Sequence, residues 1–141
     1  MKLNRIMQEG YGENAWHGAN LKMALADVTP ELAFWRPAPD RHNIAEIALH
    51  HAWCTRSVRG QLSSPPTDPF LLDGEDWFPV SERDRVTWPQ IQAAVDAEQD
   101  KLSSVVESLK NDAQLDLVLG ITCHAVYHAG QVQLIKRLRA E

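Results

Sequence analysis

The feature that most constrains this 141-residue sequence is a long run near its C-terminus, from Leu115 to Leu138, in which apolar residues recur at helical spacing. Two histidines within the run, His124 and His128, lie four residues apart, so they project from one helix face about one turn from each other. Because that stripe is otherwise mainly apolar, we expect the helix to bury it. The other members of the stripe are Leu117, Ile121, Gln131 and Ile135.

Burying two imidazoles costs free energy unless each ring finds a polar partner. One interpretation is a pair of core histidines that hydrogen-bond to neighbouring side chains. The other is a divalent metal ion bound by both rings, which a spacing of four residues allows. Short motifs of this kind also arise by chance, so a metal site requires at least a third ligand from elsewhere in the chain.

Composition places the chain among ordinary globular proteins, with 44% apolar and 23% charged residues. Its length fits one domain spanning residues 1–141. The net charge of −5 and the lack of a basic cluster argue against a nucleic-acid partner. The first residues do not resemble a secretory signal, and no apolar run is long enough for a membrane span. Cys54 and Cys123 are too few for a disulfide framework, so we expect a cytoplasmic protein with no membrane partner.

A capping box marks the start of one long helix. Asn43 can cap the helix with its side chain, while Glu46, three residues later, can reach back to the backbone of Asn43. We expect this helix to extend to about Arg59 and to end at Gly60. Glu46 is accordingly interpreted as a capping residue and not as an acid or base.

Similar signatures place the remaining helices. Thr87 and Gln90 have the capping spacing and open a helix expected to run to about Lys110. Thr29, followed by proline, starts a short helical turn through residue 34. A loosely amphipathic segment predicts a further helix over residues 15–26.

The connection at residues 61–86 is long and rich in proline. Its apolar residues, including Phe70, Trp77 and Phe78, argue against disorder, and we expect it to fold over one end of the domain. Strand signals are nearly absent from the sequence. The pattern therefore predicts an all-α protein with four main helices and a long connection between the second and the third.

The third ligand is expected from the 44–59 helix, which carries His50. Bundles of this size commonly build metal sites from facing helices, so His50 can join His124 and His128. Three neutral imidazoles leave open coordination positions, as in catalytic zinc sites, and they suit zinc, nickel, copper or iron. His51 points about a quarter-turn away, so we expect metal binding to depend on His50 and much less on His51.

Three further residues are candidates for the surroundings of the site. Gln131 can orient a ligand or hold a metal-bound water from one turn beyond His128. Cys54 lies one turn beyond His50 and either approaches the metal or, as we favour, fills space as a small apolar side chain. His17 either lines the site from the first helix or occupies a turn beside Trp16.

Two tracts resemble a known family. Residues 124–134 (HAVYHAGQVQL) resemble the last helix of the DinB/YfiT-like superfamily, and residues 43–50 (NIAEIALH) resemble its second-helix motif, which ends in a metal-binding histidine. Shorter resemblances at residues 15–18, 29–31, 35–37 and 76–79 follow in order along the chain. His51 stands where the family more usually has an apolar residue.

The resemblance implies an up-up-down-down four-helix bundle that is often a homodimer. It also implies a divalent ion, such as zinc, nickel, manganese or iron, held by His50, His124 and His128. Relatives include metal-dependent thiol S-transferases, so the first hypothesis is an enzyme acting on a small molecule such as a low-molecular-weight thiol, with a metal-dependent hydrolase as the less favoured form. The second is a non-catalytic bundle that binds a metal or small ligand, since no residue is evident as an obligatory acid or base.

Overall fold

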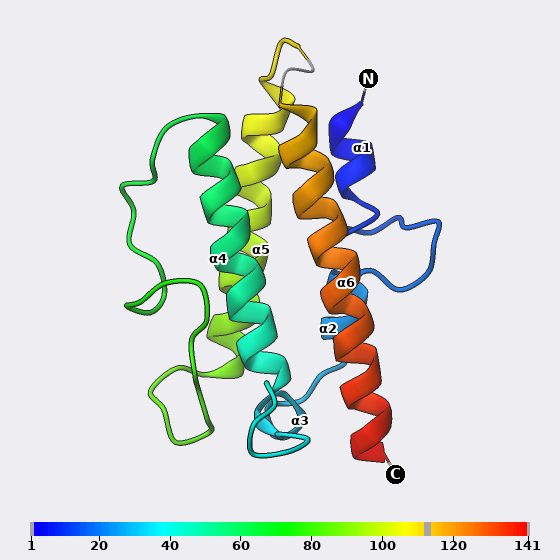
Figure 1. Cartoon of the computed structure of the whole chain (residues 1–141), viewed down its shortest axis with the longest axis vertical. Helices are drawn as coiled ribbons and strands as arrows, with labels where there is room; N and C mark the ends of the chain where they lie inside the picture. Colours follow the sequence, from blue (N-terminus) through cyan, green and yellow to red (C-terminus); the bar gives the residue numbers. More distant parts are fainter. Residues whose placement is uncertain (1, 112–113, 141) are drawn as a thin grey trace.

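A computed structural model of the chain, described for residues 2–111 and 114–140, contains helices and no strand among those residues (Figure 1). The expectation of an all-α fold is thus confirmed. In chain order the helices are α1 (Leu3–Met7), α2 (Leu21–Ala26), α3 (Pro30–Phe34), α4 (Ile44–Leu62), α5 (Trp88–Glu107) and α6 (Leu115–Ala140).

The three long helices do not all point the same way. α4 and α5 run parallel, and α6 runs antiparallel to both (Figure 1). The apolar core reflects these directions, because the last residue of α4, Leu62, shares a cluster with Val106 near the end of α5 and Val118 near the start of α6. α1 and α2 follow the direction of α6, since Leu3 belongs to that same cluster while Leu25 packs into the cluster at the other end.

This arrangement corrects the expected up-up-down-down order: the segment from α1 to α2 runs in the same direction as α6, and α4 and α5 run in the opposite direction (Figure 1). A chain that leaves the end of α4 must travel back along α4 before a parallel α5 can begin. Residues 63–87 therefore run beside α4, and do not fold over one end of the domain as expected (Figure 1).

Two anchors hold this connection against the helices. The carboxylate of Asp68 lies 3.2 Å from Arg56 of α4 and 2.8 Å from Lys101 of α5. Further along, Phe70 and Phe78 pack around the ring of Trp53, at centroid distances of 5.6 Å and 5.9 Å. These contacts fix the path of the residues between the anchors, which pass the middle of α4.

The start of α4 is as predicted, with both hydrogen bonds of the Asn43–Glu46 capping box in place. Its end differs, because the helix passes through Gly60 and stops at Leu62. The returning chain explains the glycine: a Cβ at this position would approach Cδ of Pro66 to 3.0 Å.

The predicted 15–26 helix begins only at Leu21. Asn20 caps it by accepting a hydrogen bond from the backbone of Met23, while its amide donates to the carbonyl oxygens of Gln8 and Gly12. These tertiary bonds keep the preceding residues in an irregular loop. The Thr29 and Thr87 caps form as predicted, but α5 ends at Glu107, three residues early.

Candidate metal centre

His50 lies on α4, and the connection after α4 holds its ring from two sides. Its Nδ1 is 2.9 Å from the carbonyl oxygen of Asp76 and 3.1 Å from Oδ1 of the same residue. The indole of Trp77 stacks on the imidazole, with centroids 3.9 Å apart and planes within 4°. Because a carbonyl oxygen only accepts, we assign the ring proton of His50 to Nδ1, which leaves a lone pair on Nε2.

The backbone at Asp76 is unusual, with a φ of 65° in the left-handed region. Aspartate tolerates this region better than most residues other than glycine. Gly74, with a φ of 123°, allows the chain to turn just before it. The turn brings both the carbonyl and the carboxylate of Asp76 within hydrogen-bonding distance of His50.

His124 and His128 approach His50 from α6. Nε2 of His124 lies 3.2 Å from Nε2 of His50 and 3.1 Å from Nε2 of His128. On the far side of its ring, His128 places Nδ1 2.6 Å from Oε1 of Gln131. That amide oxygen accepts the Nδ1 proton, so His128, like His50, presents a lone pair on Nε2.

Nε2 of His124 thus faces two lone pairs, one on Nε2 of His50 and one on Nε2 of His128. One proton on its Nε2 forms a single good hydrogen bond, which leaves the nitrogen of either His50 or His128 poorly paired. If the proton of His124 lies instead on Nδ1, three lone pairs meet without a proton between them. A cation near Nε2 of His124 is a partner that such lone pairs can share.

His51 also faces this cluster. Its Nδ1 is 3.0 Å from Nδ1 of His124, and the two rings stack with centroids 5.3 Å apart. This contact is not predicted from the sequence, because helical spacing alone indicates only one buried stripe on α4. Every residue from Ile44 to Ala52 is buried, so a side chain a quarter-turn from His50 still points into the interior.

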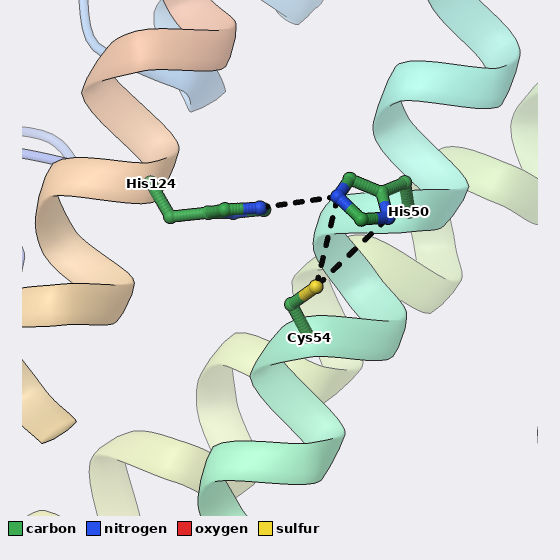
Figure 2. Close-up of side chains that lie close together, drawn as sticks. All are labelled: His50, Cys54 and His124. Carbon is green, nitrogen blue, oxygen red and sulfur yellow. Dashed lines mark hydrogen bonds between the residues drawn. The ribbon is translucent and has the colours of Figure 1, made fainter. Parts of the chain in front are cut away.

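Cys54 completes a group of side chains that are able to hold a metal ion. Ligand atoms of His50, Cys54 and His124 all lie within 4.8 Å of one another (Figure 2). The sulfur is 3.9 Å from Nδ1 and 3.8 Å from Nε2 of His50. Burial, reinforced by the carboxylate of Asp76, raises the pKa of the Cys54 thiol to about 11, which favours the protonated thiol at neutral pH.

Three histidines of the cluster, His51, His124 and His128, have lowered pKa values that favour the neutral ring. Burial, together with the neighbouring imidazoles, lowers the pKa of His124 to about 4 and that of His51 well below its ordinary value. Burial likewise lowers the pKa of His128, although the bond to Gln131 acts in the opposite sense. Neutral imidazole is the form that binds metal ions, so these rings are ready for one near pH 7.

Among the residues singled out from sequence, the structure brings His50, His124, His128, Gln131 and Cys54 together. His17 is not among the residues that contact this group. It is exposed, and its Nε2 lies 2.6 Å from the carbonyl oxygen of Glu9, which corresponds to the alternative of a turn residue.

Two contributors from the connection were not predicted as site residues. Asp76 and Trp77 lie in the tract that resembles the family, but no helical periodicity reveals which loop residue meets which ring. Trp77 is itself enclosed, since His42 stacks on its other face with centroids 3.8 Å apart. His42 in turn bonds to Glu46, whose capping role is as predicted, so the start of α4 also supports the site.

No helix in the described parts of the chain has the length and apolar character needed to cross a membrane. Neither a curated protein nor a solved structure matches the chain. The sequence model of the DinB superfamily matches residues 13–132, a stretch that includes His50, His124 and His128. Because this match extends over most of the 141-residue chain, the protein belongs to the DinB superfamily.

Proposed function

We propose that this protein binds one divalent metal ion, such as zinc, nickel, manganese or iron, through the Nε2 atoms of His50, His124 and His128. The observation that carries the proposal is that Nε2 of His124 lies 3.2 Å from Nε2 of His50 and 3.1 Å from Nε2 of His128. Two nitrogens each about 2.1 Å from one ion lie about 3.0 Å apart at a right angle and about 3.4 Å apart at the tetrahedral angle. The two separations that involve His124 fall between these limits, whereas the group whose ligand atoms all lie within 4.8 Å of one another contains Cys54 in place of His128.

The contacts behind the ligands support the same assignment. Metal-binding histidines usually donate their second ring proton to an oxygen or a similar acceptor, which fixes the tautomer. His50 donates to Asp76, and His128 donates to Gln131. Gln131 therefore orients a ligand, one of the two roles considered for it from sequence.

We propose further that the protein is a metal-dependent thiol transferase. A bound divalent ion supplies Lewis acidity, which lowers the pKa of a thiol and leaves it a nucleophilic thiolate. The chain needs no nucleophile of its own for such a reaction, and the raised pKa of Cys54 makes that thiol a poor one. The substrates are a low-molecular-weight thiol and an apolar electrophile.

A hollow beside the cluster suits the apolar electrophile. It has a volume of about 600 Å³ and is formed by the connection together with the start of α5. Its lining includes Trp77, whose ring also stacks on His50, but no histidine of the candidate site. Trp77 and Phe78 line the hollow, whereas Phe70 packs against Trp53.

A metal-binding bundle without catalysis is the alternative. It is favoured by the enclosure of the cluster, in which His50 is covered by Trp77 and His128 is only 3% exposed. A metal-dependent hydrolase is the less favoured catalytic form, with water in place of the thiol.

We also propose that α1 and α2 together take the place of the first helix of a four-helix bundle, and that the bundle forms a homodimer. The outer face of α6 supports the dimer because it exposes large apolar side chains on a single stripe. These are Leu119, Val126, Tyr127, Leu134 and Leu138. A second copy of the chain would remove this stripe from water.

One experiment tests metal binding and transfer in sequence. Metal-free protein is titrated with zinc, nickel, manganese and ferrous ions, and the loaded protein is then assayed with a panel of thiols and a chromogenic electrophile. We expect one ion per chain, lost in His124→Gln and His128→Gln and retained in His17→Gln, a control for removing a histidine outside the cluster. Metal binding without thiol-dependent turnover would refute the transferase and leave the binding protein.

A further inference from the structure

His51 is a fully buried imidazole that the proposed ligand set leaves without a role. It is 1% exposed, and each of its ring nitrogens meets one polar group. Nδ1 lies 3.0 Å from Nδ1 of His124, and Nε2 lies 3.3 Å from Oγ1 of Thr55. Burying this ring is costly unless both contacts are hydrogen bonds.

We propose that His51 and Thr55 are positioning residues that hold His124 in its metal-binding tautomer. In this arrangement, a hydrogen-bonded chain from Thr55 through His51 keeps the proton of His124 on Nδ1 and directs the lone pair of Nε2 toward the ion. The inference rests on the proposed function, because it takes His124 to be a ligand.

The direction of these hydrogen bonds follows from the hydroxyl of Thr55, which has one proton and two possible acceptors nearby. Its Oγ1 is 2.9 Å from the carbonyl oxygen of His51 and 3.3 Å from Nε2 of the same residue. The carbonyl can only accept and is the nearer group, so it takes the hydroxyl proton. Oγ1 then accepts a hydrogen bond from Nε2–H of His51.

A neutral His51 with its proton on Nε2 has a bare Nδ1. The only proton available for the 3.0 Å contact is then that of His124 Nδ1, which donates to His51. The opposite direction would put the proton of His124 on Nε2, between the lone pairs of His50 and His128. With the proton of His124 on Nδ1, each ring nitrogen of His50, His51, His124 and His128 has a hydrogen-bond partner or the ion as its partner once an ion is bound.

With these hydrogen bonds, all three proposed ligands have the same arrangement of protons. Each ring places its Nδ1 proton on a separate acceptor, which is Asp76 for His50, His51 for His124 and Gln131 for His128. His51 differs from the other two acceptors because it is itself a tautomeric group, so it needs Thr55 to set its proton. Thr55 thus acts on the ligand from two hydrogen bonds away.

The test compares four variants of the full-length protein. His51→Leu removes the acceptor, whereas His51→Asn restores one, since a side-chain carbonyl can lie near the position of Nδ1. Thr55→Val removes the hydroxyl with little change of shape. Thr122→Val is the matched control, because Thr122 is a buried threonine whose hydroxyl also donates to the carbonyl four residues earlier, at 2.7 Å, and bonds to no histidine among the described residues.

Zinc affinity, measured by competition with a chelating indicator, is the first readout. Loss of such an outer partner typically weakens binding about 10-fold to 100-fold, and we expect this for His51→Leu. His51→Asn should recover most of the affinity, Thr55→Val should lie between them, and Thr122→Val should match the wild type. The second readout is the ¹⁵N spectrum of the imidazoles in metal-free protein, in which His124 should carry its proton on Nδ1 and lose that preference in His51→Leu.

The outcomes separate this inference from the proposed function. A wild type that binds no zinc would refute the metal site itself. A wild type that binds zinc, with His51→Leu folded and equally tight, would refute the positioning role alone. The same conclusion would follow if His124 of the metal-free wild type carried its proton on Nε2.

Discussion

Asp76, at a backbone φ of 65°, places its carbonyl oxygen 2.9 Å and its Oδ1 3.1 Å from Nδ1 of His50. A residue of the long connection is thereby tied to a candidate ligand on α4. Left-handed backbone outside glycine costs about 1 kcal/mol, so the turn must be held by its surroundings. The stacking of Trp77 on the same ring supplies part of that support.

The first prediction follows from this geometry. Asp76→Gly keeps the turn and the carbonyl acceptor and removes only the carboxylate, so zinc affinity should fall modestly. Asp76→Val cannot adopt the turn without strain, so the carbonyl should move away and affinity should fall about 10-fold to 100-fold. Competition titration measures both. The control is Glu75→Gln, which removes the neighbouring exposed charge; equal affinities for Asp76→Val and this control would show that the turn does not orient His50.

Helix starts were predictable from sequence because capping is local. Asn43 with Glu46, and Thr87 with Gln90, satisfy backbone groups within four residues and need no partner from elsewhere. Helix ends and the N-terminal segment were not predictable in the same way. Gly60 continues α4 where a stop was expected.

The candidate ligands were predictable for a related reason. Their spacing of four residues placed His124 and His128 on one face of α6, where His128 is buried and His124 half-buried, and His50 lies on the buried start of α4. The roles of Asp76 and His51 were not predictable, since one depends on the path of an irregular loop and the other on the burial of all sides of α4. Helix directions were likewise missed, although the length of the connection should have indicated that α4 and α5 are parallel.

The second prediction concerns acid. The pKa of His124 is about 4 in the folded chain and about 6.5 when unfolded, so the unfolded state binds more protons between these values. Folding stability of the metal-free protein should therefore fall as the pH drops from about 6.5 toward 4, by at most about 1.4 kcal/mol per pH unit from this residue. His51 and His128 act in the same direction.

Thermal unfolding followed by circular dichroism in the presence of a chelator measures this effect. His124→Gln should show a shallower loss of Tm across the same range, because its side chain does not titrate. His17→Gln, which replaces an exposed histidine outside the cluster, should follow the wild type. Identical pH profiles for His124→Gln and the wild type would contradict the prediction.

The third prediction tests the proposed dimer. Leu134 is 57% exposed on the outer stripe of α6, and a lysine there would place charge within the interface. Leu134→Lys should be monomeric by sedimentation and still bind zinc, because Leu134 is exposed and is not one of the proposed ligands. Met23→Lys changes an apolar residue on α2 that is 46% exposed, and it should leave the assembly intact. A monomeric wild type would exclude the dimer.

The fourth prediction concerns Glu46, whose buried carboxylate receives several hydrogen bonds. Arg36 donates to both oxygens, at 2.8 Å and 2.7 Å, and the backbone amides of Val80 and Asn43 donate as well. Glu46→Gln keeps the shape but replaces an acceptor by a donor, and should destabilise the protein by about 1–3 kcal/mol in urea unfolding. Glu31→Gln, at an exposed acidic position in the first turn of α3, should change stability little.

The last prediction decides between two donor sets, three histidines or His50 and His124 with Cys54. The sulfur of Cys54 is almost equally far from both nitrogens of His50, at 3.9 Å and 3.8 Å, and therefore does not approach along the Nε2 lone pair. Its raised pKa, about 11, further disfavours the thiolate that a metal requires. Nε2 of His128, by contrast, is 3.1 Å from Nε2 of His124 and already presents a lone pair.

Cobalt(II) in place of the native ion reports the difference directly, since a cobalt–thiolate bond adds an intense near-ultraviolet charge-transfer band to the weak visible bands. We expect the visible bands alone, the same spectrum in Cys54→Ser, and loss of cobalt binding in His128→Gln. Cys123→Ser, at the exposed cysteine, controls for stray thiol binding. A charge-transfer band that disappears in Cys54→Ser and persists in His128→Gln would instead make Cys54 the third ligand and place His128 outside the coordination sphere.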